Sequence, residues 1–250
     1  RTARIGKMVL RYLVTTAATG MYYPTADELM AVRKDFVNEF EVEPFLAAYQ
    51  SDSIVGFSDA SFASTKEHSF GGFMITIGGS PVSWKCCRQT LISSSTCESE
   101  LQAAQDSHLG TLNVQVLCEE LFPAKFYLVT LAVDNQATVL LLTAVTATSW
   151  RTRHLRVRAA TLVQAEKKGL AIVHCPGVVE LADILTKAVP VARMNLLRAL
   201  AMMRASYLQE TPVFVVKAMK RTTGAPGKGH EAGIPKGSHI KQLMRDKEKR

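Results

Sequence analysis

The 250-residue sequence has no long hydrophobic segment and no export signal. A membrane-spanning helix needs about 20 consecutive apolar residues, and the most apolar stretch, residues 126–142, is interrupted by Asp134 and Asn135. Nothing near the N-terminus has the ordered charged, hydrophobic and small-residue regions of a signal peptide. We therefore expect an intracellular protein that is not secreted and has no membrane partner. Because the first residue is Arg1, we also expect the chain to be a segment of a longer protein.

The sequence also lacks the cysteine patterns of zinc sites and disulfide-rich domains. Its five cysteines are an odd number, and none of them forms a C-x-x-C pair or a Cys/His cluster with zinc spacing. This pattern predicts ordinary buried thiols in a reducing compartment.

Most of the chain has little excess charge of either sign. The net charge is +8, but the last forty residues contain ten Lys/Arg and three Asp/Glu, whereas residues 51–210 contain fourteen and thirteen. The basic excess therefore belongs to a C-terminal tail and not to the folded region. A basic tail can hold a polyanion without sequence preference, or it can simply be solvated, and both interpretations stay open.

Hydrophobic periodicity, a tight hairpin turn at Gly78-Gly79-Ser80 and a serine-rich helix cap at 93–96 predict an α/β fold. Three successive strands precede alternating helices and strands, which implies a mixed five-stranded sheet with helices on both faces. Strands are expected at 53–59, 71–79, 81–87, 126–133 and 170–174, and helices at 5–19, 29–40, 97–120, 136–145, 150–168, 179–187 and 191–208.

Four carboxylates occupy positions in these elements where a solvated charge is not the default: Asp59, Glu100, Asp134 and Asp183. One strand-terminal aspartate alone is usually a turn or cap residue. Two apolar strands that end in aspartates and lie side by side would bring Asp59 and Asp134 together, and like charges at that distance need a cation. Hard divalent ions, Mg²⁺ above all, prefer oxygen ligands. The spacing by itself predicts an acidic metal cluster and nothing more specific.

The segments around these carboxylates resemble the ribonuclease H domain of Ty1/copia-type retrotransposon, retrovirus-related Pol polyproteins. Residues 56–63 read G-F-S-D-A-S-F-A, residues 134–137 read D-N-Q-A, and residues 181–187 read L-A-D-I-L-T-K. The resemblance covers roughly residues 53–190, and further matching segments are 69–84, 85–101 and 151–158. Ser61 stands where the family usually has a second aspartate, and no histidine lies between Pro176 and Glu180, where cellular ribonucleases H often carry one.

The resemblance implies a ribonuclease H-like fold and hydrolysis of the RNA strand of RNA–DNA hybrids during reverse transcription. It implies two Mg²⁺ ions, with Mn²⁺ as a substitute, held by the catalytic and metal-binding set Asp59, Glu100, Asp134 and Asp183. Glu98 competes with Glu100 for the helix position. We choose Glu100 because an apolar residue and a run of small residues follow it.

The resemblance also suggests a domain organisation. Residues 1–23 look like the end of a reverse transcriptase, 24–52 form a helical linker, 53–190 the ribonuclease H-like domain, 191–210 a C-terminal helix, and 211–250 a basic, disordered tail. The implied partners are an RNA–DNA hybrid and the reverse transcriptase domain of the same polyprotein. The implied location is the cytoplasm, a virus-like particle or the nucleus.

Candidate substrate contacts are mostly basic or lie next to the carboxylates. A cluster of arginines without acids suits sequence-independent phosphate contact, although a solvated basic face has the same composition. Contacts to 2′-hydroxyls would distinguish RNA from DNA. The candidate nucleic-acid-binding residues are Ser58, Ala60, Asn135, Arg151, Arg153, His154 and Arg156.

Two other functions compete with this one. A catalytically inactive or domesticated retroelement relic would keep the fold and only bind nucleic acid. An integrase-type polynucleotidyl transferase on the same fold would use a D-D-E set, and Asp183 in L-A-D disfavours it.

Overall fold

The computed structural model describes residues 2–17, 19–30, 50, 52–63, 68–143 and 153–205. All of these belong to one compact unit, residues 1–219, and the second unit, residues 220–250, lies outside the described residues. The predicted basic tail at 211–250 therefore stays a prediction.

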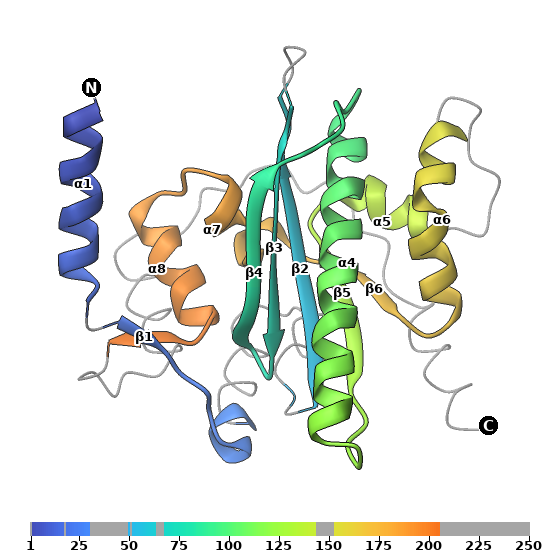
Figure 1. Cartoon of the computed structure of the whole chain (residues 1–250), viewed down its shortest axis with the longest axis horizontal. Coiled ribbons are helices and arrows are strands. Elements are labelled where there is room, and N and C mark those ends of the chain that lie inside the picture. The colour runs from blue at the N-terminus through green and yellow to red at the C-terminus, as the bar shows by residue number, and fades with distance from the viewer. Residues whose placement is uncertain are drawn as a thin grey trace, which may run out of the picture. The chain divides into compact units, whose positions relative to one another are not determined.

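A mixed five-stranded sheet forms the centre of the fold (Figure 1). Its strands lie in the order β4-β3-β2-β5-β6; β2 is antiparallel to β3 and parallel to β5, and β5 is parallel to β6. The strands are β2 (Ser53–Ser61), β3 (Phe70–Ile77), β4 (Ser80–Arg88), β5 (Leu128–Val133) and β6 (Ala171–His174).

Helices cover both faces of this sheet. On one face, α4 (Thr96–Leu121), α5 (Gln136–Thr143) and α6 (Arg153–Lys167) bury a cluster that includes Leu101 and Leu131. On the other face, α7 (Asp183–Thr186) and α8 (Val191–Leu200) belong to a cluster that includes Phe57 and Met74. The predicted fold class, α/β with a mixed five-stranded sheet and helices on both faces, is thus confirmed.

Two local signals begin and join these elements as the sequence predicts. Ser95 caps α4, because its side chain accepts a hydrogen bond from the Glu98 backbone N–H at 3.2 Å. Gly78 and Gly79 form the two-residue turn between β3 and β4, with φ of 55° and 80°. These positive φ values explain why both turn residues are glycine.

The N-terminal segment pairs with the segment that follows α8. After helix α1 (Thr2–Thr15), strand β1 (Thr19–Met21) pairs antiparallel with β7 (Met203–Ala205). The Tyr22 carbonyl accepts a hydrogen bond from Ser80 Oγ at 2.8 Å, which ties this segment to the start of β4. The predicted domain boundaries remain predictions.

Four predicted elements differ from the structure. The helix expected at 5–19 spans Thr2–Thr15, and strand β1 follows it. The helix expected at 191–208 ends at Leu200, and the chain then turns through Met202, with φ of 52°, into β7. The helix expected at 179–187 is a 3₁₀ turn, Gly177–Val179, followed by the single turn of α7. Strand β2 continues two residues beyond Asp59 instead of ending there. Of the helix expected at 29–40, the residues after 30 lie outside the described part of the chain.

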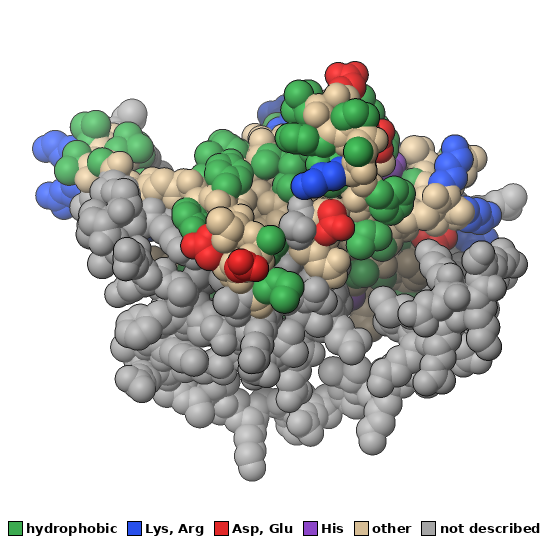
Figure 2. Space-filling view, turned by 90° about the horizontal axis from the view of Figure 1, so that it is seen from below, with side chains coloured by type: hydrophobic (Ala, Val, Ile, Leu, Met, Phe, Trp, Pro, Cys, Tyr) green, Lys and Arg blue, Asp and Glu red, His purple; other side chains and the backbone are tan. Residues whose placement is uncertain are grey.

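The second half of α4 exposes apolar side chains. Leu109, Val116, Leu117 and Leu121 are all more than half exposed. Figure 2, seen from below Figure 1, shows hydrophobic side chains gathered in a projecting group with acidic and basic ones around them.

Among the described residues, no helix combines the length and apolar character that a membrane span requires.

Helix α7 can approach the sheet closely because residue 72 of β3 is glycine. Gly72 pairs with Asp59 across the ladder, so both residues share the face that α7 covers. A Cβ at this position would lie 2.8 Å from Thr186 Cγ2 and 3.1 Å from Leu185 Cβ. Any larger residue must therefore push α7 away from Asp59.

We predict that Gly72→Ala lowers the free energy of unfolding by about 1–3 kcal/mol, the usual effect of overpacking a core. Urea unfolding of the metal-free chain measures it. Gly20→Ala is the matched control, because a Cβ there would meet nothing within 4 Å. Equal stability of the two variants would contradict this account of the α7 contact.

Candidate active site

Parallel pairing of β2 with β5 brings two aspartates together. Ser58 pairs with Val133 in the ladder, so the next residue of each strand, Asp59 and Asp134, lies at the same edge of the sheet. Asp59 is fully buried, whereas the Asp134 side chain is 18% exposed. The carboxyl end of parallel strands is where ligands bind in sheets of this kind.

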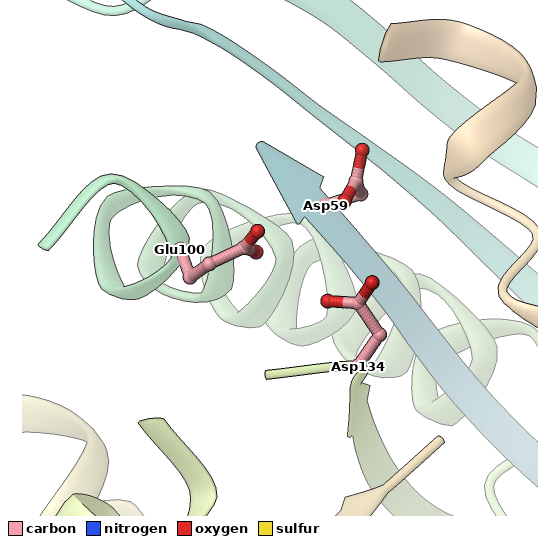
Figure 3. A group of neighbouring side chains, drawn as sticks. All are labelled: Asp59, Glu100 and Asp134. Carbon is pink, nitrogen blue, oxygen red and sulfur yellow. The ribbon is translucent and has the colours of Figure 1, made fainter. Parts of the chain in front are cut away.

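The third carboxylate comes from the first turns of α4. Glu100 projects from this helix toward Asp59 and Asp134 (Figure 3). One oxygen from each of the three carboxylates lies within 4.8 Å of the other two. The Glu100 side chain is more than nine-tenths buried, and its Oε2 has no hydrogen-bond partner in the described part of the chain. A buried carboxylate oxygen without a partner is unfavourable unless a ligand satisfies it.

Glu98 points elsewhere, as its position two residues earlier on the same helix requires. Its Oε2 accepts hydrogen bonds from the Ser94 backbone N–H and hydroxyl, both at 2.6 Å. Its Oε1 forms an ion pair with Arg158 of α6. Glu98 thus binds the residue that precedes the N-cap Ser95 and joins α4 to α6. Glu100 is the helix carboxylate that faces the aspartates.

Asp183 approaches the cluster through a shared cation. Lys187 Nζ lies 2.7 Å from Asp183 Oδ1, 2.8 Å from Asp59 Oδ1 and 3.8 Å from Asp134 Oδ2. The other Asp183 oxygen, Oδ2, accepts from Arg193 of α8. Asp183 is therefore brought to the same site, with both of its oxygens bound to basic side chains.

Burial and repulsion between neighbouring charges raise the pKa values of Glu100 and Asp134. Burial raises the pKa of Glu100 to about 9, and the charges of Asp59 and Asp134 add to this effect. Burial and the Asp59 charge also raise the pKa of Asp134, while Lys187 opposes the change. Burial by itself lowers the pKa of Lys187, but its hydrogen bonds to Asp183 and Asp59 raise it above the ordinary value. The protein alone does not stabilise all of these carboxylates in the ionised form.

The donor set fits a hard divalent cation. Asp59, Glu100 and Asp134 offer carboxylate oxygens of the kind that Mg²⁺ prefers, and the unpartnered Glu100 Oε2 is one of these donors. Such an ion would favour the ionised forms that burial disfavours.

Of the predicted substrate-contacting residues, some are buried, some are partly or fully exposed, and some lie outside the described part of the chain. Ser58 is fully buried, with its hydroxyl 3.5 Å from the Ala132 carbonyl, and the Ala60 backbone donates to Glu100. Asn135 Oδ1 accepts from the Thr138 backbone N–H at 3.0 Å and caps α5. Arg156 is exposed on α6. Arg151 and the side chains of Arg153 and His154 lie outside the described part of the chain.

The sequence interpretation missed residues that surround the carboxylates. Lys187 follows Asp183 by one helical turn in the matched L-A-D-I-L-T-K segment, so the motif contained a signal for it. Thr186 of the same segment donates its hydroxyl to Asp59 Oδ2. Glu180 is fully buried beside them, and its Oε1 accepts from the Ala182 backbone N–H at 3.1 Å. No residue pattern in the sequence indicates the contribution of Arg193.

The comparisons with known proteins give a limited result. No protein-family model matches the chain, and neither does any curated protein. Among solved structures, the ribonuclease H1 called LC11, isolated from compost by a metagenomic approach, is 16% identical with a TM-score of 0.43, and the match covers 54% of this chain and 92% of that one.

Two further structures give similar values. Ribonuclease H1 from the halophilic archaeon Halobacterium salinarum is 20% identical with a TM-score of 0.38 over 53% of this chain and 93% of that one. The structure of LC11 ribonuclease H1 in complex with an RNA/DNA hybrid is 16% identical with a TM-score of 0.40 over 53% and 92%. Because the identities and scores are this low, the function has to be inferred from the site itself.

We predict that the metal-free chain loses stability as pH rises because Glu100 must ionise. Its pKa is about 9 in the folded chain against an ordinary 4.5. Its contribution to stability is therefore complete below pH 4.5 and is lost as pH rises through about 9. Glu100→Gln should remove this loss, which is on the order of 6 kcal/mol.

Urea unfolding of both proteins between pH 5 and pH 9, in the presence of a chelator, measures the difference. All other titrating groups are common to the two proteins, so the difference isolates Glu100. Parallel stability curves would contradict the raised pKa.

Glu98→Ala should weaken the fold without changing cation binding. It removes the hydrogen bonds from Ser94 at the start of α4 and the ion pair with Arg158, which together contribute about 1–2 kcal/mol. Urea unfolding and calorimetric titration with Mg²⁺ measure the two effects. Glu119→Ala, which removes an exposed carboxylate bonded to Gln115 near the other end of α4, is the control. A large loss of cation affinity in Glu98→Ala would reverse the roles of Glu98 and Glu100.

Proposed function

We propose that this protein is a ribonuclease H that cleaves the RNA strand of RNA–DNA hybrids with the help of divalent cations. The observation that carries the proposal is the convergence of carboxylate oxygens from β2, α4 and the end of β5 within 4.8 Å of one another. The motifs around these residues and their resemblance to retrotransposon ribonucleases H supply the reaction and the substrate class.

Asp59, Glu100 and Asp134 would hold the cations, and Asp183 would complete the set. Two Mg²⁺ ions held there, or Mn²⁺ in their place, would activate a water molecule and stabilise the leaving oxygen in phosphodiester cleavage. The chain itself fixes the carboxylates: Asp59 and Asp134 by strand register, and Glu100 by the capped helix. Water adds to phosphorus as the bond to the 3′ oxygen breaks, which leaves 3′-hydroxyl and 5′-phosphate ends.

Substrate contact would come from the surface beside the carboxylates. Arg156 is exposed on α6, and with Arg151, Arg153 and His154 it would contact phosphates without sequence preference. Asn135 follows Asp134 directly and is partly exposed, so its free amide hydrogens could reach a 2′-hydroxyl. Ser58 and Ala60 are buried, so we expect little direct contact between their side chains and the substrate.

The motif matches further support a place in reverse transcription. In this proposal the chain is the nuclease segment of a retrotransposon Pol polyprotein, and residues 1–23 are the end of its reverse transcriptase. Such a protein would act beside its polymerase, in the cytoplasm, in a virus-like particle or in the nucleus.

Cleavage of a hybrid with a labelled RNA strand tests the activity. We expect Mg²⁺-dependent cuts in the RNA of the hybrid, and none in double-stranded RNA or double-stranded DNA of the same sequence. Asp134→Asn should lower the rate at least about 100-fold, because it replaces a cation ligand. Asp106→Asn is the matched control, because Asp106 is an exposed carboxylate of α4 outside the cluster.

Two results would contradict the proposed function. A purified wild-type chain that binds the hybrid but cuts nothing would instead fit the non-catalytic relic. Equal cutting by wild type and Asp134→Asn would place the chemistry elsewhere.

A further inference from the structure

A basic side chain of the protein already occupies the candidate cation site. Lys187 Nζ lies 2.8 Å from Asp59 Oδ1 and 2.7 Å from Asp183 Oδ1. These distances are those of charge-assisted hydrogen bonds. Asp134 Oδ2, at 3.8 Å, faces the same ammonium group. Lys187 thus touches, or nearly touches, three of the four carboxylates to which we assign cation binding.

In the two carboxylates that contact Lys187 directly, Asp59 and Asp183, each oxygen already has a hydrogen-bond partner. Asp59 Oδ2 accepts from the Thr186 hydroxyl, and Asp183 Oδ2 accepts from Arg193. Glu100 differs from them, because its Oε2 has no hydrogen-bond partner in the described part of the chain. In one half of the site, Asp59 and Asp183 are bound by side chains of the protein itself. In the other half, Glu100 keeps an oxygen without a partner among the described residues.

A divalent cation and this ammonium group compete for the same oxygens. Mg²⁺ binds carboxylate oxygens at about 2.0–2.1 Å and tolerates little distortion of its ligands. An ammonium group hydrogen-bonded to the same carboxylates repels it, because both carry positive charge and the surroundings are partly desolvated. Binding at Asp59 and Asp183 then requires that Lys187 leave them.

The position of Lys187 in the fold allows such a movement. It directly follows the last residue of α7, and its side chain is 38% exposed, so the ammonium has a path to water. Four methylene groups join that ammonium to the backbone, which permits large displacement without movement of α7.

We propose that Lys187 is a built-in counter-cation, which holds Asp59 and Asp183 together in the metal-free protein and which divalent cations must displace. This inference rests on the proposed function, because it describes how the same site is filled. It assigns Lys187 a positioning role: it keeps the acidic set assembled before the cations bind, and it lowers the affinity of the site for them.

Calorimetric titration of the full chain with Mg²⁺ alone, without nucleic acid, tests the proposal. Lys187→Met keeps most of the side-chain stem and removes the charge, so the Kd for Mg²⁺ should fall about tenfold, which corresponds to about 1.4 kcal/mol. Lys187→Arg restores a cation and should return the Kd to the wild-type value or raise it. Lys85→Met is the control, because Lys85 pairs with the exposed Asp106 outside the site, and its Kd should equal that of wild type.

Thermal unfolding gives a second readout and checks that each variant folds. Without divalent cations, Lys187→Met should melt below wild type, because Asp59 and Asp183 lose their shared partner. Saturating Mg²⁺ should narrow the difference. If Lys187→Met proves too unstable to purify, Lys187→Gln, which keeps a hydrogen-bond donor, replaces it in both measurements.

An unchanged or higher Kd for the uncharged variants would overturn the proposal, since the ammonium would then not compete with the cation. The readouts separate this inference from the nuclease activity. A chain that cuts no hybrid but binds Mg²⁺ more tightly without Lys187 would refute the proposed function alone. A chain that cuts hybrids and shows no change in Kd would refute this inference alone.

Discussion

Repulsion among buried carboxylates is the constraint on which the arrangement of the site depends. Asp59 and Asp183 are almost completely buried and Glu100 is nearly so, and in surroundings of low dielectric constant such charges cannot all persist without compensation. The protein compensates in two ways that differ across the site. Lys187 and Arg193 neutralise Asp59 and Asp183 through ion pairs, whereas burial keeps Glu100 protonated near neutral pH. A divalent cation would replace both solutions at once, because its charge favours every carboxylate as an anion.

The fold brings these charges together through features that are individually ordinary. Strand register aligns Asp59 with Asp134. The N-cap Ser95, together with the hydrogen bonds of Ser94 to Glu98, fixes where α4 begins and thereby which way Glu100 points. Gly72 removes a side chain where α7 packs on β3. The free energy that assembles the acidic site is thus spread over backbone pairing, helix capping and apolar packing, and the ion pairs of Lys187 and Arg193 then hold Asp59 and Asp183 within it.

The sequence was sufficient for the parts of this arrangement that local patterns determine. The strand and helix order, the Gly78–Gly79 turn and the start of α4 follow from periodicity, turn residues and capping residues, and the structure confirms them. The choice of Glu100 over Glu98 rested on the motif. In the structure Glu100 faces the aspartates, whereas Glu98 binds Ser94 and Arg158. Long-range strand pairing could not be predicted from local patterns. The residues after Leu200 form β7 because they pair with β1, some 180 residues earlier, and no local sequence signal indicates this pairing. The contact of Lys187 with Asp59 also spans 128 positions. The matched L-A-D-I-L-T-K segment marks Lys187 as part of a motif, but nothing local places its side chain beside Asp59.

Glu180 shows how far the surroundings of the site are adapted to excess negative charge. It is fully buried beside the acidic residues, yet no basic side chain among the described residues contacts it in an ion pair. Burial raises its pKa well above the ordinary value, although the hydrogen bond from the Ala182 backbone opposes this, and the charges of Asp134, Asp59 and Asp183 raise it further. A fifth anion here would compete for Lys187 and Arg193, which Asp59 and Asp183 already share. A neutral Glu180 instead braces the backbone just before Asp183 through its bond to Ala182. The protein therefore uses the same chemical group for two purposes, and the distance from a cation decides whether a given carboxyl binds charge or only supports the chain.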